Sequence, residues 1–252
     1  MSRIRLACVL VLLLPALAPA GDFELGREAL RRKDYEQAII HFNAYMQANP
    51  KPTAAAYYNR GVAHYGKKDY DWAIADFSES IRLDPRFADA YGNRASVYLL
   101  KKEYDKAIQD SDTALRLNPR HPVAANNRGS AYAAKKQYDK AVAVFQEAIR
   151  LNPNRPDAYN NLAWLLSTCP QAAVRDGHKA LQFALKACDF SDWRNAEMLD
   201  TLAAAYAECK MFAEAAQWQK RAVEMGHADR EDVEKALRRL KLYEQGKPYR
   251  QE

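Results

Sequence analysis

The sequence contains little glycine and cysteine, with 9 Gly and 4 Cys among 252 residues. So few glycines exclude a collagen-like or loop-rich chain, and so few cysteines exclude a disulfide-rich scaffold. Its 5 histidines lack metal-ligand spacing, and it carries no glycine-rich phosphate loop or serine–histidine–aspartate arrangement. We therefore expect no enzyme activity, no cofactor and no bound metal; a thiol–imidazole pair of Cys169 and His178 is the remaining enzymatic hypothesis.

Long apolar runs are also missing after the N-terminus. Arg3 and Arg5 precede an apolar run over residues 6–14, and Ala18-Pro19-Ala20 supplies small residues at a cleavage site. A bilayer-spanning helix needs about 20 apolar residues, so this run is too short for an anchor, although an uncleaved anchor is the alternative. The pattern predicts a signal peptide over residues 1–20, cut after Ala20, and hence a periplasmic or secreted protein with no membrane insertion after cleavage.

The rest of the sequence is rich in helix-forming residues and in charges of both signs. Ala, Leu, Lys, Glu and Gln are plentiful, 48% of the chain is hydrophobic and 28% is charged. These residues favour an all-α fold with a core. Removing Arg3 and Arg5 lowers the formal net charge from +6 to +4. Because positive and negative residues alternate along the chain, a basic patch for nucleic acid is absent and no nucleic-acid partner is expected.

The main pattern is an internal repeat of about 34 residues. Prolines, small residues, alanines and aromatic residues recur with this step, in the series Pro50, Pro85, Pro119 and Pro153; Gly26, Gly61, Ala95 and Gly129; Ala38, Ala73, Ala107 and Ala141; and Phe42, Phe77 and Phe145. Small residues let two antiparallel helices approach closely, whereas a proline stops one helix and resets the chain. One such hairpin cannot bury its apolar face alone, so the units must stack.

These residues resemble the tetratricopeptide repeat family, and the resemblance covers roughly residues 22–225. It implies a right-handed α-solenoid of about six helical hairpins. The expected units are residues 22–53, 54–87, 88–121, 122–155, 156–195 and 196–225. The fifth unit has an enlarged turn in which Asp176 caps the next helix, and residues 226–252 form a capping helix and a mobile tail.

The family resemblance also implies a binding surface, because the first helix of each hairpin lines a concave groove. One offset of that helix carries asparagine in four successive units, which suggests an amide ladder that grips a peptide backbone. The predicted peptide-binding residues are Asn59, Asn93, Asn127, Asn161, Tyr58, Asn126, Asn160 and Trp164. The alternative is that these amides bond within the repeat. The family's carboxylate clamp is matched only at Asn59, and Asp89 places an acid where the clamp needs a base.

Three cysteines remain after export, namely Cys169, Cys188 and Cys209. Cys169 and Cys209 fall at equivalent ends of neighbouring first helices, so they could form a disulfide if the enlarged turn brings them within reach. The alternative is three separate thiols.

Together these patterns predict a protein–protein interaction scaffold that binds a protein or peptide in its groove, in the cell envelope or outside the cell. The alternative is a homo-oligomeric structural component of an envelope assembly. The two hypotheses differ in the solution mass that they predict.

Overall fold

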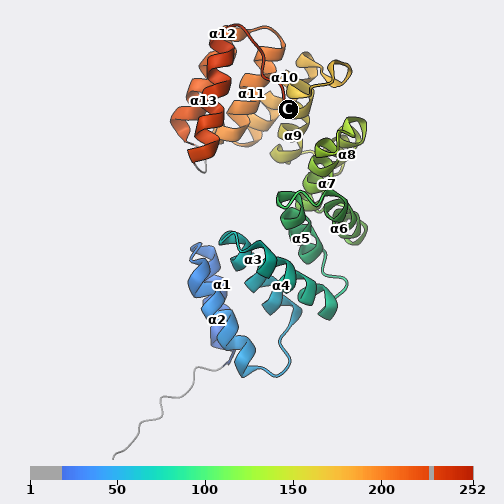
Figure 1. The fold of residues 1–252 in the computed structure, drawn as a ribbon, viewed down its shortest axis with the longest axis vertical. Coiled ribbons are helices and arrows are strands. Elements are labelled where there is room, and N and C mark those ends of the chain that lie inside the picture. Colours follow the sequence, from blue (N-terminus) through green and yellow to red (C-terminus); the bar gives the residue numbers. More distant parts are fainter. Residues whose placement is uncertain (1–18, 227–229, 252) are drawn as a thin grey trace, which may run out of the picture. The chain divides into compact units, whose positions relative to one another are not determined.

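A computed structural model describes residues 19–226 and 230–251. The predicted signal peptide therefore lies outside the described residues except for its last two positions, Pro19 and Ala20, which begin the first helix. The chain forms two compact units, Met1–Pro85 and Arg86–Glu252 (Figure 1). The first unit contains helices α1 to α4, and the second contains α5 to α13.

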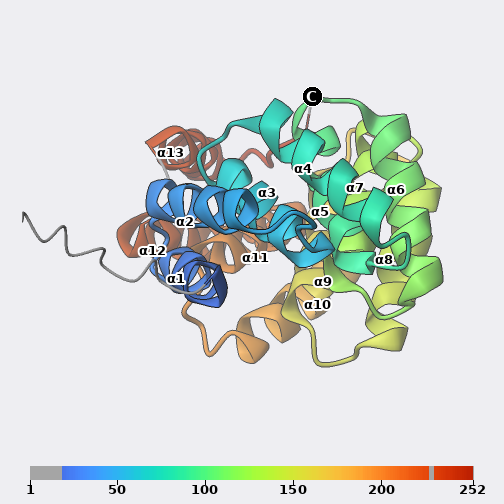
Figure 2. The same ribbon diagram turned by 90° about the horizontal axis from the view of Figure 1, so that it is seen from below.

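The described residues are helical, and none of them forms a β-strand, so the all-α prediction is confirmed. The helices are α1 (Pro19–Arg31), α2 (Tyr35–Ala48), α3 (Ala54–Gly66), α4 (Tyr70–Leu83), α5 (Ala88–Leu100), α6 (Tyr104–Leu117), α7 (Pro122–Ala134), α8 (Tyr138–Leu151), α9 (Pro156–Thr168), α10 (Gly177–Phe190), α11 (Ala196–Glu208), α12 (Phe212–Met225) and α13 (Arg230–Glu244), with a short 3₁₀ helix η1 (Ala172–Val174). Consecutive helices pair into hairpins, such as α1 with α2 (Figure 2).

The hairpins close where a small residue faces an aromatic ring. A methyl group added to Gly61 of α3 would lie 2.8 Å from the ring of Phe77 on α4. A methyl group added to Gly26 of α1 would lie at the same distance from the ring of Phe42 on α2. Both phenylalanines are fully buried. The predicted glycine-to-aromatic register of the repeat is therefore the packing contact of each of these hairpins.

Short polar residues define many helix ends. Asp34, Thr53 and Asn195 cap the starts of α2, α3 and α11 by accepting backbone N–H bonds. The predicted cap at Asp176 is also present, because its carboxylate accepts from the Lys179 N–H at 3.0 Å. It closes an enlarged turn, residues 169–176, that contains η1.

Buried ion pairs connect the two helices of successive hairpins. Arg60 binds Asp76 at 2.9 and 2.7 Å, and Arg94 binds Asp110 at 2.7 and 2.8 Å. Each aspartate follows its arginine by 16 residues and is nearly inaccessible to solvent. These pairs occupy interior positions of the hairpins, so they orient one helix against the other as well as joining them.

Helix α13 covers α12, as the prediction of a capping helix requires (Figure 1). The buried face of α13 includes a charged residue, since Leu237 is 46% exposed whereas Arg239 is only 8% exposed. Arg239 turns inward because its guanidinium binds Asp200 of α11 at 2.8 Å. Residues 247–251, for which the sequence predicts a mobile tail, contact α9 and α11 through Tyr249, Arg250 and Gln251.

None of the helices in residues 19–226 and 230–251 combines the length and the apolar character that a bilayer crossing requires.

The glycine contact predicts the effect of overpacking. Replacing Gly61→Leu should lower the free energy of unfolding by about 1–3 kcal/mol, since the new side chain must displace the buried Phe77 ring. Chemical denaturation followed by circular dichroism measures this effect. Gln47→Leu, at an exposed position of α2, serves as the control, and an unchanged midpoint for Gly61→Leu would refute the packing register.

The ion pairs predict that two aspartate substitutions lower the free energy of unfolding by different amounts. Asp110→Ala should cost about 3 kcal/mol because it leaves the largely buried Arg94 without its carboxylate. The matched variant is Asp112→Ala, which removes the half-exposed partner of Arg128 and should cost less than about 1 kcal/mol. Equal denaturation midpoints for the two variants would contradict a structural role for the buried pair.

Candidate functional site

A cavity of about 400 Å³ lies between α7, α8 and α9 of the second unit. We call it the α9 groove. Its lining residues come from the three helices, the α7–α8 turn and the C-terminal tail: Ser130, Ala133, Ala134, Lys136, Tyr138, Phe145, Asn161, Trp164, Leu165, Tyr249 and Gln251. The predicted peptide-binding residues Asn161 and Trp164 are thus brought together in one place.

The walls of the α9 groove combine aromatic surface with a few polar groups. Tyr138 and Phe145 are buried beneath it, and burial raises the pKa of the Tyr138 hydroxyl. Ser130 and Asn161 add a hydroxyl and an amide to the lining. Such a surface can take an apolar or aromatic side chain and hydrogen bond the backbone that carries it.

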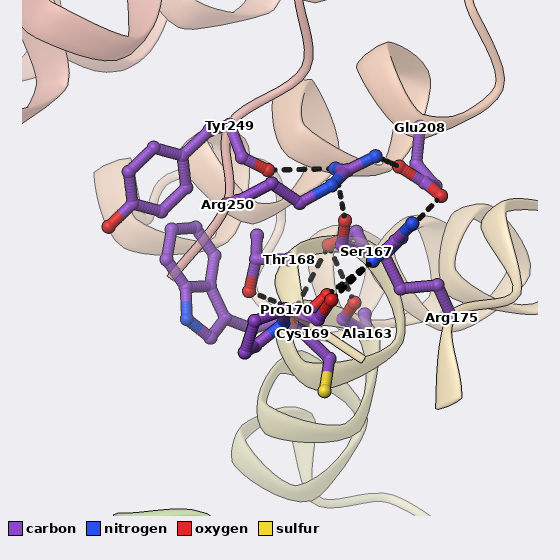
Figure 3. Close-up of polar contacts among 10 residues, drawn as sticks. Ala163, Ser167, Thr168, Cys169, Pro170, Arg175, Glu208, Tyr249 and Arg250 are labelled. Carbon is purple, nitrogen blue, oxygen red and sulfur yellow. Dashed lines mark hydrogen bonds and ion pairs between the residues drawn. The ribbon is translucent and has the colours of Figure 1, made fainter. Parts of the chain in front are cut away.

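The C-terminal tail, residues 247–251, forms one wall of the α9 groove. The Tyr249 ring lies 5.8 Å from the Trp164 ring, and the Gln251 N–H donates to the Thr168 carbonyl at 2.9 Å. Arg250 donates to the Ser167 carbonyl at 3.3 Å and pairs with Glu208 at 2.5 Å (Figure 3). The tail is therefore held by backbone and side-chain contacts at the C-terminal end of α9.

Arg175 completes this arrangement from the enlarged turn. It donates to the carbonyls of Cys169 and Pro170 at 2.8 and 3.1 Å, and to Glu208 at 3.0 Å (Figure 3). Carbonyls at the end of a helix lack intrahelical donors and carry partial negative charge. Two arginines therefore satisfy the end of α9, and Glu208 of α11 balances them.

Behind Trp164 lies a buried polar cluster centred on Asp200. Its carboxylate accepts from Gln219 at 2.5 Å and from Arg239 at 2.8 Å. The Arg239 guanidinium also lies over the Trp164 and Tyr249 rings, 5.4 and 5.6 Å from their centroids. Trp164 therefore contacts both α13 and the tail, which leaves only part of its surface for a ligand.

The asparagine positions of the second unit have different surroundings. Asn127 is buried and donates to the Gly92 carbonyl and the Ser96 hydroxyl of α5, at 3.0 and 2.7 Å. Asn161 donates to the Asn126 carboxamide oxygen, so this pair joins α9 to α7. The Asn160 carboxamide oxygen is buried and has no hydrogen-bond partner among the described residues. The amide of Asn127 thus holds neighbouring hairpins together and faces a helix, whereas Asn161 lines the α9 groove.

Asn93 lies on α5, and the other two predicted residues belong to the first unit. The Asn59 amide donates to the Ala55 carbonyl within α3 at 2.8 Å, and the Tyr58 ring packs 5.9 Å from Phe77. Tyr58 and Asn59 therefore make contacts inside their own hairpin.

A second cavity, of about 190 Å³, is lined by Arg128 and Val144 of α7 and α8. In this hairpin the series of buried arginine–aspartate pairs is interrupted. Val144 stands 16 residues after Arg128, at the position that holds aspartate in the two preceding hairpins. Arg128 pairs instead with Asp112 at 2.9 Å, and its buried Nε has no hydrogen-bond partner within residues 19–226 and 230–251. Asn126 and Asn161 both line this cavity, and Asn161 also lines the α9 groove.

Cys169, Cys188 and Cys209 are free thiols in the structure, so the disulfide considered between Cys169 and Cys209 is not formed in it. Burial raises the pKa of all three thiols, and it raises that of Cys188 to about 12. Cys209 is the most accessible of the three and packs against Gly177 at the start of α10.

Sequence reasoning missed Tyr138 and the tail residues Tyr249 and Gln251. Tyr138 could have been predicted, because the repeat places a tyrosine two residues after a turn lysine, as in Lys102-Glu103-Tyr104 and Lys136-Gln137-Tyr138. The tail follows the last repeat and has no periodic counterpart, so no pattern signalled its docking.

The thiol environments predict an order of alkylation in the reduced chain. At pH 8 the thiolate fraction of Cys188 should be on the order of a thousandfold below that of an ordinary cysteine, given its pKa of about 12. Iodoacetamide followed by peptide mass spectrometry should find Cys209 modified first and Cys188 modified only after denaturation. Early modification of Cys188 in the native chain would contradict its burial.

Comparison with known families identifies the repeat. Residues 54–87 and 88–121 match the family described as tetratricopeptide repeat, and residues 129–166 match a family described as TPR repeat. A stretch of 73 residues is 42% identical to the small glutamine-rich tetratricopeptide repeat-containing protein 2 of Saccharomyces cerevisiae. That stretch covers 28% of this chain and 20% of the yeast protein, so the likeness concerns a minor part of the relative.

Solved structures with the same fold cover more of the chain. The pilF protein of Pseudomonas aeruginosa is 20% identical over 87% of this chain and 96% of its own, with a TM-score of 0.67. A thermophilic TPR protein of Thermus thermophilus is 22% identical over 73% of this chain and 99% of its own, with a TM-score of 0.62. At these identities the likeness concerns the fold alone. Hairpin geometry, repeat matches and structural neighbours agree, and this chain is a tetratricopeptide repeat protein.

Proposed function

We propose that this chain is a scaffold that binds an extended segment of a protein partner in the α9 groove. The observation that carries the proposal is the cavity of about 400 Å³, walled by Tyr138, Phe145 and Trp164 and edged by the Asn161 amide. Aromatic side chains in partly enclosed pockets supply much of the affinity of protein interfaces. An amide beside them can bond a peptide backbone whatever its side chains are.

The groove uses the predicted site only in part. Asn161 and Trp164 line it, whereas the Asn127 amide is already bonded to α5. Binding therefore depends on the aromatic walls more than on an asparagine ladder. Because the enclosed volume is small, we expect one or two anchoring side chains of the partner to enter it, while flanking residues follow α7 and α9.

We further propose that the protein acts in the cell envelope or outside the cell. This rests on the basic and apolar segment before Ala20, which has the layout of a cleavable signal peptide. Expression of the whole gene followed by mass spectrometry of the exported product tests this point. A mature N-terminus at Gly21 is expected, and retention of residues 1–20 on an intracellular product would overturn it.

Site-directed crosslinking of the mature chain tests the groove. A photoreactive phenylalanine analogue at Ala134, an exposed lining residue, should crosslink a polypeptide in envelope extract. The matched control carries the analogue at Val123, which is 38% exposed on the same helix and does not line the α9 groove. The crosslink from position 134 should fall at least tenfold when Ser130→Arg introduces bulk and charge into the groove.

Two outcomes would contradict the proposal. Equal crosslinking from positions 134 and 123 would show contact without groove specificity, and so would a crosslink that Ser130→Arg leaves unchanged. A crosslinked product of twice the chain mass that contains only this protein would favour the homo-oligomer instead. Mass spectrometry of the product distinguishes these results.

A further inference from the structure

We infer that the end of α9, together with Glu208 of α11, is a binding site for an extended segment that carries an aromatic residue followed by a basic one. In this structure the chain's own tail, through Tyr249 and Arg250, occupies that site. The inference rests on the proposed function, since it extends the α9 groove and specifies the chemistry of what binds there. We call this surface the tail site.

The contacts at the tail site are those of a bound peptide. The tail is non-helical after Glu244 and presents a backbone N–H, from Gln251, to the Thr168 carbonyl at 2.9 Å. Tyr249 covers one side of Trp164, with ring centroids 5.8 Å apart. Each of these contacts could be made equally by a segment of another chain, because neither depends on the connection to α13.

The tail site suits a positively charged side chain, because the Glu208 carboxylate and the carbonyls at the end of α9 line it. Arg175 already binds the carbonyls of Cys169 and Pro170, whereas the Ser167 carbonyl accepts from Arg250 of the tail (Figure 3). The Thr168 carbonyl accepts from the Gln251 N–H. Glu208 lies with one oxygen on Arg175 and the other on Arg250, at 3.0 and 2.5 Å. A guest with a neutral or acidic residue at the position of Arg250 would leave that second oxygen unpaired in a largely buried position.

The aromatic requirement follows from Trp164 and Arg239. The Arg239 guanidinium lies over both the Trp164 and Tyr249 rings, so a ring at the position of Tyr249 gains a stacking and a cation–π contact together. An aliphatic side chain at this position would keep only the apolar packing against Trp164. The order aromatic then basic is therefore favoured over either residue alone.

The tail site and the α9 groove are continuous. Tyr249 and Gln251 line the groove along with Asn161 and Trp164, so displacement of the tail would lengthen the groove toward α11. The tail is only half-buried, and its tether gives it a local concentration on the order of millimolar. A partner with the same aromatic and basic pair must compete with the tail at that local concentration. The tail is therefore an internal competitor.

A labelled peptide with the sequence of residues 246–252 tests the inference on the full mature chain. The tail is released by the double substitution Tyr249→Ser and Arg250→Ser, and the peptide is titrated by fluorescence anisotropy. We expect at least tenfold tighter binding to the released-tail chain than to the parent, because the parent's own tail competes. A peptide with serine in place of its tyrosine and arginine is the matched control, and it should not bind.

Two further variants separate this inference from other accounts. Glu208→Gln in the released-tail chain should weaken peptide binding at least fivefold, while Val123→Arg should leave it unchanged because Val123 is an exposed residue of α7 outside the groove lining. Circular dichroism melts confirm that each variant is folded. If the peptide binds but the groove crosslink at Ala134 is absent, the tail site stands and the proposed function fails.

Three results would overturn the inference. They are equal affinity for parent and released-tail chains, equal binding of the control peptide, and no saturable binding up to about 2 mM, the order of concentration that a short tether provides. In each case the tail would be a permanent cap of α9 and not a displaceable ligand.

Discussion

The close approach of two antiparallel helices across a single small residue is the constraint on which this structure depends. Gly61 against Phe77 and Gly129 against Phe145 leave no room for a larger side chain at the glycine position. A hairpin closed in this way exposes an apolar face that only the next hairpin can cover. The need to stack one hairpin on the next follows from that geometry.

Most of the fold was predictable because its determinants recur at fixed offsets. Small residues, alanines and prolines repeat every 34 residues or so, and this pattern predicted the helical hairpins, while the enlarged fifth turn predicted the cap at Asp176. The inward turn of Arg239 was not predictable, since it depends on Asp200, 39 residues earlier. The docked tail depends on Ser167 in the same way, across 83 residues. Contacts of that range leave no local pattern in a sequence.

In the candidate site, too, the repeat predicts the position of a residue along the helix but not its contacts. One repeat offset supplied Asn59, Asn127 and Asn161, yet the three amides bond to a helix carbonyl, a neighbouring hairpin and another asparagine. The offset fixes where a side chain begins but not what surrounds it, because the neighbours change from unit to unit. The replacement of an ion-pair aspartate by Val144 has a comparable effect, as it turns Arg128 toward Asp112 and leaves a cavity.

In the unbound chain the tail occupies the end of α9 through Tyr249, Arg250 and Gln251, and we propose that this surface recognises a partner. Hydrogen exchange of the chain, read by mass spectrometry on the peptide that contains Gln251, reports on this contact. Exchange in the unbound chain should be slower than that of an unstructured peptide, because the Gln251 N–H is bonded to the Thr168 carbonyl, and it should become faster once a partner fills the site. Exchange at the unstructured rate in the unbound chain would show that the tail does not occupy the end of α9.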